Sequence, residues 1–246
     1  MALQLDLDGA VVVVTGGERG VGLGITRAFQ RAGATVITCG RHPPEQPAGE
    51  FIACDVRESV QVERLLETVL ARHGRLDTLV NNAGGTPFAP AAEATPRFHE
   101  KVVGLNLLAP LLVSQRANEI MQQQDAGGTI VMVSSVSATR PSPGTAAYGA
   151  AKAGLDSLAA SLAVEWAPRV RVNALDVGMV RTERAAEHFG AAAVQTIPLG
   201  RLAEPDEIGC CAVFLASPLA GYVSGARLLV HGGGEAPAFL TAPAPG

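Results

Sequence analysis

The sequence predicts an α/β protein: a single domain with a doubly wound parallel sheet of about seven strands and helices on both faces. Short β-branched runs alternate with longer helix-like segments along the whole chain, which is the rhythm of repeated strand–helix–strand units. Several expected strands, such as those containing Val11–Val14 and Ile130–Val133, are near-continuous apolar runs, as in strands covered on both faces. A glycine-rich turn also follows the first expected strand and runs directly into a helix.

The expected elements follow one another in the order that such a sheet requires. The strands are expected at Ala10–Thr15, Thr35–Cys39, Glu50–Cys54, Thr78–Asn81, Gly128–Ser134, Arg171–Leu175 and Ala226–Val230. The helices are expected at Gly22–Ala32, Ser59–His73, around Phe98–Gln123 as one long helix, at about Tyr148–Trp166 and at about Pro205–Ala216. Asp55 or Ser59 is suited to cap the second helix, and Gly74 stands where the left-handed residue after its last turn belongs.

Length and composition fit one compact domain. The chain has 246 residues, of which 48% are hydrophobic and 17% charged. Typical proteins have about 25% charged residues, so this chain can bury a large core. We assign residues 1–235 to the domain. Residues 236–246 form a tail whose three prolines suit a disordered segment or one lying on a partner subunit.

Charge and hydropathy exclude several classes of function. The formal net charge is −4 and the 19 Lys and Arg residues are scattered, so the chain has no basic patch for nucleic acid or anionic lipid. The N-terminus does not have the pattern of a signal peptide, and the longest apolar stretch, Val102–Val113, is interrupted and shorter than the ~20 residues of a membrane span. These features predict a soluble, cytoplasmic protein. Cys39, Cys54, Cys210 and Cys211 lack metal-ligand spacing, so we expect reduced, mostly buried thiols and no metal site.

The turn after the first strand has the composition of a phosphate-binding loop. Thr15–Gly22 reads Thr-Gly-Gly-Glu-Arg-Gly-Val-Gly, and a helix starts at its end. Glycine lets the backbone approach a pyrophosphate, and the helix N-terminus offers free N–H groups and a positive dipole end. A tight structural turn is the alternative use of these glycines. Because the segment lies between a strand and a helix, we interpret it as the dinucleotide-binding turn of a Rossmann-type fold.

The end of the second expected strand bears on the choice of cofactor. An acidic residue about 20 positions after such a turn binds the ribose 2′-OH of NAD, whereas an arginine accommodates the 2′-phosphate of NADP. The tripeptide Cys39–Arg41 carries no carboxylate, so Arg41 and Arg19 could clamp that phosphate. We therefore predict NADP(H) in preference to NAD(H). Against this, both arginines could be plain surface residues, and Glu18 could neutralise Arg19. Asp55 could accept the adenine amino group or cap the next helix.

Candidate groups for proton transfer stand near the fifth expected strand. Tyr148 and Lys152 are four residues apart at the start of a helix and share one face. A neighbouring ammonium and a bound oxidised nicotinamide both favour the phenolate, so a tyrosine of ordinary pKa about 10 can act as general acid or base near neutral pH. Ser134 and Ser135 close the strand, at the edge where parallel sheets bind ligands, and Ser137 is nearby. A hydroxyl there can bind a substrate carbonyl, although serine at a strand end more often forms a turn.

Several motifs together resemble the classical form of the short-chain dehydrogenase/reductase family. They are Thr15-Gly-x-x-x-Gly-x-Gly22, Asn81-Asn82-Ala83-Gly84, Asn106, Ser135 and Tyr148-x-x-x-Lys152. The resemblance covers about residues 6–234. Ser135 precedes Tyr148 by thirteen residues, as in the family, which favours Ser135 over Ser134 and Ser137. Within the family, the chain is similar to 3-oxoacyl-[acyl-carrier-protein] reductase-like members.

The resemblance implies a role for each matching residue. Tyr148 is the acid/base, and Ser135 orients and polarises the carbonyl. Lys152 binds the ribose and lowers the tyrosine pKa. Asn106 holds a water in a proton relay from Lys152 to solvent, a role compatible with a buried amide that bridges an irregular helix turn. The implied cofactor-binding residues are Thr15, Gly16, Glu18, Arg19, Gly20, Val21, Gly22, Arg41, Asp55, Val56, Asn82, Ala83, Gly84, Tyr148, Lys152, Gly178, Val180 and Thr182.

The chain departs from the family pattern at two places. Val177 stands where the family usually has the proline of Asn-x-x-x-Pro-Gly, while Thr182 remains where the family binds the carboxamide. His231 replaces the aspartate of the usual Asp-Gly-Gly, in a region that packs between subunits in the family. We expect the substrate wall at Thr139–Thr145, together with an alanine-rich lid at about 183–197.

We therefore predict an NADP(H)-dependent oxidoreductase that interconverts a carbonyl and a secondary alcohol on a small or acyl-type substrate, without a metal. Two alternatives stay open. One is an NAD-dependent alcohol dehydrogenase of the same family, and the other is a catalytically idle nucleotide-binding sensor or scaffold. The resemblance also implies a homo-oligomer, a dimer or homotetramer built through the helices at about 98–123 and 148–166, whereas composition alone would also allow a monomer.

Overall fold

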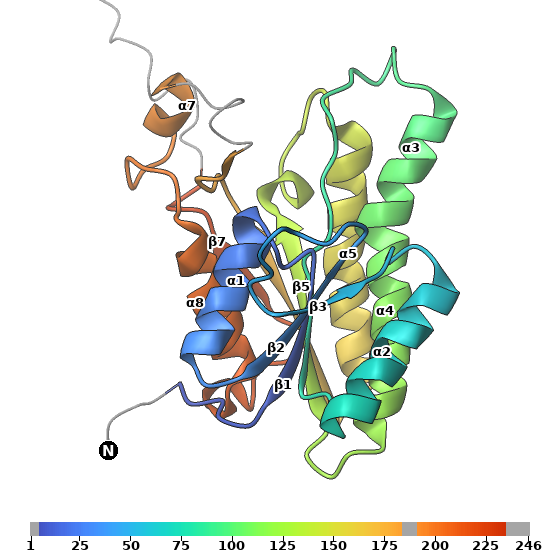
Figure 1. The fold of residues 1–246 in the computed structure, drawn as a ribbon. Helices are drawn as coiled ribbons and strands as arrows, with labels where there is room; N and C mark the ends of the chain where they lie inside the picture. The colour runs from blue at the N-terminus through green and yellow to red at the C-terminus, as the bar shows by residue number, and fades with distance from the viewer. Residues whose placement is uncertain (1–4, 184–190, 235–246) are drawn as a thin grey trace, which may run out of the picture.

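A seven-stranded parallel sheet forms the middle layer of the protein (Figure 1). The computed structural model describes residues 5–183 and 191–234. Within them the strands are β1 (Val11–Thr15), β2 (Thr35–Gly40), β3 (Glu50–Ala53), β4 (Thr78–Asn81), β5 (Gly128–Ser135), β6 (Val170–Val177) and β7 (Arg227–Val230). They are arranged β3-β2-β1-β4-β5-β6-β7, and all neighbours are parallel. The order reverses between β1 and β4, the kind of point at which doubly wound sheets bind ligands.

Helices cover both faces of this sheet (Figure 1). α1 (Gly20–Arg31) and α8 (Pro205–Ala216) lie on one face. On the other face lie α2 (Ser59–His73), α4 (Ala109–Gln122) and α5 (Ala146–Glu165). Shorter helical segments are α3 (Pro96–Val103), η1 (Gly104–Leu108), η2 (Val136–Ala138), α7 (Ala191–Gln195) and η3 (Pro218–Ala220). The predicted Rossmann-type doubly wound fold is therefore confirmed.

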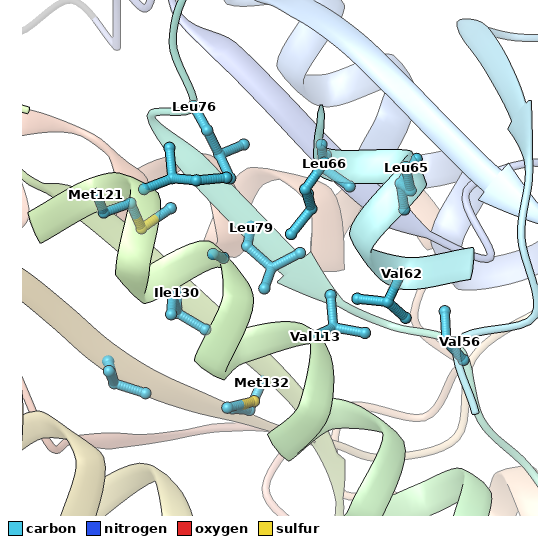
Figure 2. Close-up of a cluster of buried hydrophobic side chains, with 14 of the residues drawn as sticks. Val56, Val62, Leu65, Leu66, Leu76, Leu79, Val113, Met121, Ile130 and Met132 are labelled. Atoms are coloured by element: carbon cyan, nitrogen blue, oxygen red, sulfur yellow. The ribbon is translucent and has the colours of Figure 1, made fainter. Parts of the chain in front are cut away.

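Each face of the sheet has its own hydrophobic core. Alternate side chains of β1 point to opposite faces, so Val11 and Val13 join one cluster and Val12 and Val14 the other. Figure 2 shows the cluster beneath α2 and α4, whose labelled members are Val56, Val62, Leu65, Leu66, Leu76, Leu79, Val113, Met121, Ile130 and Met132. Burying one such side chain contributes roughly 1.5–3 kcal/mol. This two-sided burial is the physical reason for the near-continuous apolar strands.

Two glycines bring α1 and α8 into close contact. A Cβ on Gly24 would lie 2.3 Å from the carbonyl carbon of Pro205, and one on Gly209 would lie 2.5 Å from the carbonyl oxygen of Gly24. Both distances are shorter than van der Waals contact, so only glycine fits at either position. The contact anchors α1, whose first turn follows the glycine-rich segment.

The long helix expected around Phe98–Gln123 runs from Pro96 to Gln122, and its middle is π-helical. It starts at Pro96, where the Thr95 hydroxyl accepts a hydrogen bond of 3.2 Å from the N–H of Phe98. Its α-helical pattern then gives way to the π-helical segment η1 before resuming in α4. The expected long helix is therefore confirmed, and a wider turn with i→i+5 bonds lies in its middle.

The other predicted boundaries are close to those observed. α2, β4 and α8 have the expected bounds, whereas α1 and α5 each begin two residues earlier than expected. Gly74 ends α2 in the left-handed conformation, with φ of 74°, as predicted. The predicted cap of α2 is wrong, since the N-cap residue is Glu58, without a side-chain cap bond, and Ser59 is the first helical residue.

The predicted state of the cysteines is confirmed in part. All four thiols are free, and Cys39 and Cys54 are buried. Cys211 is half-buried and Cys210 is exposed, because Cys210 lies on the outer side of α8.

Parts of two predicted segments fall outside the described residues. The tail at 236–246 does so entirely, and the lid at about 183–197 does so at positions 184–190. The C-terminal part of the lid contains the short helix α7. Among the residues that the structure describes, no helix is both long enough and apolar enough to cross a membrane.

Candidate active site

The carboxyl ends of four neighbouring strands bring the predicted site residues to one edge of the sheet. β1 ends at Thr15, β4 at Asn81, β5 at Ser135 and β6 at Val177. Ser135 and Val177 are direct partners in the β5–β6 register. The loops that follow these strands therefore meet where parallel sheets bind their ligands.

The glycine-rich turn has a backbone suited to a pyrophosphate. Gly16 and Gly20 have positive φ angles of 64° and 51°. A Cβ on Gly22 would lie 2.1 Å from the carbonyl oxygen of Gly16, so the turn closes only around glycine. α1 follows Arg19 with neither a side-chain cap nor an acidic residue in its first turn, which leaves its first N–H groups to bind an anion. These features fit the phosphates of a dinucleotide.

Thr15 and Asn82 join this turn to the turn after β4. The Thr15 hydroxyl oxygen accepts hydrogen bonds from the N–H groups of Asn82 and Ala83, at 3.0 and 2.9 Å. The Asn82 amide donates to the carbonyl oxygens of Thr15 and Gly16, at 2.9 and 3.1 Å. Both side chains therefore hold the glycine-rich turn against the turn after β4, and the hydrogen bonds of Asn82 have a structural role, as expected in part for the Asn82–Gly84 turn.

Glu18 points away from the neighbouring arginine. Its carboxylate accepts hydrogen bonds from the Thr38 hydroxyl of β2 and from the N–H of Ala48, the latter at 2.8 Å. Among the described residues it forms no ion pair with Arg19, which speaks against the alternative that Glu18 neutralises this guanidinium. The cause is the pairing of β1 with β2, which brings Thr38 within reach of the turn.

Arg19 and Arg41 are both exposed. The N–H of Gly16 donates to the carbonyl oxygen of Cys39 at 2.8 Å, so the glycine-rich turn adjoins the end of β2, from which Arg41 follows. Asp55 accepts hydrogen bonds from Arg57, and this contact, together with the nearby charge of Arg41, lowers the Asp55 pKa. Asp55 is thus an ionised acceptor next to β3 rather than a helix cap.

Tyr148 and Ser135 form the centre of the site. Tyr148 lies in the first turn of α5, and Ser135 ends β5. Burial raises the pKa of the Tyr148 phenol, and a hydrogen bond with Ser135 partly opposes this. The chain's own groups therefore favour the protonated phenol, and the lowering expected from a bound cofactor stays a prediction. The Ser135 hydroxyl oxygen also accepts a bond of 3.2 Å from the N–H of Ser137.

Lys152 is a buried cation beside the tyrosine. Its Nζ lies 5.7 Å from the centroid of the Tyr148 ring and donates a 2.7 Å hydrogen bond to the carbonyl oxygen of Val133. Burial lowers the Lys152 pKa to about 8, although the negative charge of Asp156 opposes the effect. This lysine can therefore exchange a proton close to physiological pH.

Asn106 links the π-helical segment to the loop after β4. Its Oδ1 accepts a 2.8 Å hydrogen bond from the N–H of Gly85, and its Nδ2 donates to the carbonyl oxygens of Gly85 and Val102, at 3.0 and 2.9 Å. The amide thus bridges an irregular helix turn. This is the structural role that was expected for Asn106 besides the binding of a water. A Cβ on Gly84 would lie 2.7 Å from Asn106 Oδ1 and 3.5 Å from Lys152 Nζ, so Gly84 separates these two groups.

The remaining predicted cofactor residues do not lie together. Thr182 lies against the glycine-rich turn, since a Cβ on Gly20 would be 3.3 Å from its methyl group. Gly178 donates its N–H to the carbonyl oxygen of Val230 at 3.0 Å, next to the end of β7. Val56 and Val180 bury their side chains in the core, and Val21 packs against it. At these three valines, a cofactor could therefore contact mainly backbone atoms.

A buried charge cluster behind Lys152 was not identified from the sequence. Asp176 of β6 and Asp156 of α5 are 0% and 4% exposed, and Arg227 of β7 pairs with both, at 2.6 and 3.2 Å. Burial and the adjacent Asp176 raise the pKa of Asp156 to about 6. The only sequence signal is the spacing of Asp156, one helical turn after Lys152; its pairing with β6 and β7 depends on the tertiary fold.

A cavity of about 220 Å³ lies beyond the ends of β5 and β6, where Val136 and Gly178 line it. Thr139 and Arg140 of the first expected wall segment line it, as does Ile197 of the second. Val136, which follows Ser135, and Gly178, which follows the strand partner of Ser135, complete the side nearest the candidate catalytic groups. Within the described residues no group of acidic, histidine or cysteine side chains could hold a metal ion.

Comparison with known proteins identifies the family. A family model described as enoyl-(acyl carrier protein) reductase matches residues 16–235. The chain belongs to the short-chain dehydrogenase/reductase family. The D-threitol dehydrogenase of Mycolicibacterium smegmatis is 35% identical over 243 residues, covering 92% of this chain and 93% of that protein. The L-rhamnose 1-dehydrogenase (NAD(P)(+)) of Azotobacter vinelandii is 35% identical, covering 90% and 95%.

A solved structure supports the same assignment. The crystal structure of gox2181 superposes with a TM-score of 0.87 at 30% identity, covering 94% of this chain and 97% of that one. As a short-chain dehydrogenase/reductase, the protein is an NAD(P)-dependent oxidoreductase that acts on a small molecule. The predicted family and enzyme class are confirmed.

Proposed function

We propose that this short-chain dehydrogenase/reductase interconverts a carbonyl and a secondary alcohol with NADP(H), and that Tyr148 is its acid/base. The observation that carries the proposal is the contact between the Tyr148 and Ser135 hydroxyls at the edge of the sheet, with the buried Lys152 ammonium behind the tyrosine ring. The dehydrogenases named for threitol and rhamnose support an alcohol or sugar carbonyl as the reacting group.

In the reductive direction, Tyr148 gives its phenolic proton to the carbonyl oxygen while Ser135 donates a hydrogen bond to the same oxygen. The raised pKa of the phenol keeps the proton on Tyr148 until the oxygen becomes basic. The glycine-rich turn would hold the pyrophosphate of NADPH, and the nicotinamide of this cofactor would supply the hydride. In oxidation each proton moves in the opposite sense.

Lys152 and Asn106 assist this proton transfer on the side of Tyr148 away from the substrate. The Lys152 ammonium favours the phenolate electrostatically and is placed to bind the ribose, and its pKa of about 8 lets it restore the proton. We assign to Asn106 a water that continues the path from Lys152 to solvent, since both groups face the space at Gly84. The Asn106 amide also holds that loop in position through Gly85.

Substitution of Tyr148 by phenylalanine tests the acid/base role. We expect Tyr148→Phe to lower kcat by about 10²- to 10⁴-fold, the usual contribution of a general acid or base, with cofactor affinity little changed. Tyr222→Phe is the matched control, because Tyr222, the second tyrosine of the chain, is fully exposed. Unchanged turnover in Tyr148→Phe would leave the idle nucleotide sensor as the better account of the protein.

The choice of cofactor rests on Arg19 and Arg41. Both are exposed beside the end of β2, and the carboxylate of Glu18 is bound elsewhere, to Thr38 and Ala48. Titration with NADPH and NADH at fixed ionic strength, followed by nicotinamide fluorescence, measures the preference. Arg41→Ala should cost about 1.5–3 kcal/mol in NADPH binding and little in NADH binding, whereas Arg64→Ala, on the exposed side of α2, should change neither. A preference for NADH would favour the NAD-dependent dehydrogenase.

We also propose that the enzyme assembles as a dimer or tetramer through α4 and α5. Leu108, which precedes α4, is 55% exposed, and Val164 near the end of α5 is 81% exposed. Light scattering of the purified protein should give a mass of two or four chains. Val164→Lys should lower that mass, and a single-chain mass of the unchanged protein would contradict the proposal.

A further inference from the structure

Lys152 is buried without a carboxylate in direct contact. It is 4% exposed, and its Nζ donates its hydrogen bond to a neutral group, the carbonyl oxygen of Val133. None of the ion pairs within the described residues includes Lys152. A buried charge without a partner is costly, and for a lysine this cost lowers the pKa. The protonation of Lys152 therefore depends on charges beyond contact distance.

Asp156 is the carboxylate placed to supply such a charge. It follows Lys152 by one helical turn on the buried face of α5, and it is itself 4% exposed. Residues four apart on a helix have their Cβ atoms about 5–6 Å apart, a range in which an opposite charge favours the ionised form of a group. In agreement, the charge of Asp156 raises the pKa of Lys152, against the effect of burial. The two side chains are thus linked electrostatically without forming an ion pair.

Arg227 is the ion-pair partner of Asp156, but Asp176 shares it. The Nη2 of Arg227 lies 2.6 Å from the Asp176 carboxylate and 3.2 Å from that of Asp156, and its Nε donates to Asp176 as well. Both oxygens of Asp156 are buried, and within the described part of the chain neither accepts a hydrogen bond of good geometry. The shorter contacts of Arg227 therefore go to Asp176, and part of the Asp156 charge is left to act on Lys152.

Four charged side chains balance one another in this part of the protein. Lys152 and Arg227 are cations, and Asp156 and Asp176 are anions. If Asp156 loses its charge, one positive charge is left in excess. The guanidinium of Arg227 does not deprotonate in proteins, so the excess is relieved by loss of a proton from Lys152.

The other groups around Lys152 do not replace this carboxylate. Tyr148 lies one turn earlier on α5, and α3 contributes His99, which lines a small pocket together with Tyr148. η1 contributes the neutral amide of Asn106. β5 contributes the hydroxyl of Ser134, which donates a 3.3 Å hydrogen bond to the carbonyl oxygen of Lys152. The charged residues of α3 are exposed, and these are Arg97, Glu100 and Lys101.

We propose that Asp156, held by Arg227, is a positioning residue that keeps Lys152 in its ammonium form during the reaction. This inference rests on the proposed function, in which the Lys152 ammonium favours the phenolate of Tyr148. Burial and Asp176 raise the pKa of Asp156 to about 6, so the carboxylate supports Lys152 above that pH and not below it. Its effect on the reaction should therefore be confined to neutral and alkaline pH.

The lysine content of the chain allows a direct test. Lys101 and Lys152 are its two lysines, so isotope-labelled lysine gives each ammonium its own NMR signals without any substrate. In the unchanged protein we expect Lys152 to titrate near pH 8, with a smaller inflection near pH 6 where Asp156 becomes ionised. Asp156→Asn should remove the inflection and lower the Lys152 midpoint by about one pH unit. The exposed Lys101 is the internal control and should not change.

Two further variants separate charge from shape. Asp156→Glu keeps the negative charge, so its Lys152 midpoint should stay above that of Asp156→Asn. Asp206→Asn removes a carboxylate that pairs with Arg31 on the surface, and it should leave Lys152 unchanged. Equal Lys152 midpoints in the unchanged protein and in folded Asp156→Asn would overturn the inference, and so would equal midpoints in Asp156→Glu and Asp156→Asn. If Asp156→Asn does not fold, the inflection near pH 6 decides, and its absence overturns the inference.

The pH profile of kcat connects the titration to the reaction. Lys152 midpoints of about 8 and about 7 leave roughly five times less ammonium in Asp156→Asn at pH 8, and nearly equal amounts at pH 6. For reduction of erythrulose, the ketone related to threitol, with NADPH or NADH, kcat of Asp156→Asn should therefore be about fivefold lower at pH 8 and within about twofold at pH 6. A loss of equal size at both pH values would indicate a merely structural role and overturn the inference.

The outcomes also separate this inference from the function beneath it. If the Lys152 midpoint does not respond to Asp156 while Tyr148→Phe loses activity, the inference is overturned and the proposed function stands. If the midpoint responds but Tyr148→Phe turns over normally, the link between Asp156 and Lys152 stands and the proposed acid/base role falls.

Discussion

The buried pair of aspartates behind Lys152 makes protein stability depend on pH in an unusual direction. Asp156 is almost fully buried, and its neighbours are Asp176 of β6, Arg227 of β7, Ser134 of β5 and Lys152 one turn earlier on α5. Because burial and Asp176 together outweigh Arg227 and Ser134, the pKa of Asp156 is about 6 instead of 3.8. Replacing this carboxylate by a neutral amide of the same shape, in Asp156→Asn, isolates its contribution.

The sign follows from the raised pKa in the folded protein. The contribution of Asp156 to stability is fully present below the unfolded pKa, where the group is neutral in both states, and is lost as pH rises through about 6. The displacement of the pKa from 3.8 to about 6 corresponds to about 3 kcal/mol, most of it between pH 4 and pH 8. An asparagine at this position does not titrate, so Asp156→Asn does not lose this stability as pH rises. The unfolding free energy of Asp156→Asn, relative to that of the wild type, should therefore increase by about 2–3 kcal/mol from pH 4 to pH 8.

Urea unfolding followed by circular dichroism, at pH steps between 4 and 8, measures the difference between the two proteins. Asp206→Asn serves as the control, since Asp206 is half-exposed and forms a surface ion pair with Arg31 of a kind worth at most about 1 kcal/mol. A difference that stays constant with pH would refute the reasoning. An unfolding free energy of the wild type that increases with pH relative to that of Asp156→Asn would also refute it, because an aspartate that is stabilised by its arginine behaves in this way.

Three further substitutions test the site and the core. Gly22→Ala should lower cofactor affinity at least tenfold with little change in circular dichroism, because its Cβ would lie 2.1 Å from the Gly16 carbonyl oxygen; unchanged fluorescence titration would contradict this. Phe29→Ala should lower the unfolding free energy by about 3–5 kcal/mol in urea, since this ring is wholly buried between α1 and the sheet, and a loss below 1 kcal/mol would show that the cavity collapses. Asn106→Ala should cost about 2 kcal/mol by the same assay and also reduce kcat, because it leaves the buried polar groups of Gly85 unpaired; unchanged values of both would argue against its bridging role.

Much of the architecture could be predicted from local sequence. The bounds of α2, β4 and α8 follow from periodicity, and the left-handed Gly74 follows from its place after the last turn of α2. The glycine-rich turn was predictable because its glycines act within one short segment, between a strand and a helix.

Features that depend on distant residues were not predictable in this way. The π-helical segment depends on the Asn106 amide, whose partner Gly85 lies 21 residues earlier in the chain. Asp156 and Asp176 become a pair only when α5 packs on β6, so each alone looks like an ordinary acidic residue. His231 could be noticed as a departure from a family pattern, but its position in the cavity depends on β7 lying next to β6.

The strand order also constrains how this chain can be made. β1 pairs with β2 on one side and with β4 on the other, so the sheet extends from β1 in both directions. During synthesis β2 and β3 can join β1 first, whereas the second edge of β1 stays open until Thr78–Asn81 leaves the ribosome. The outer edge of β4 must then wait for Gly128–Ser135. A nascent or truncated chain that ends between them exposes an unpaired apolar strand edge, the surface on which aggregation begins and which chaperones shield.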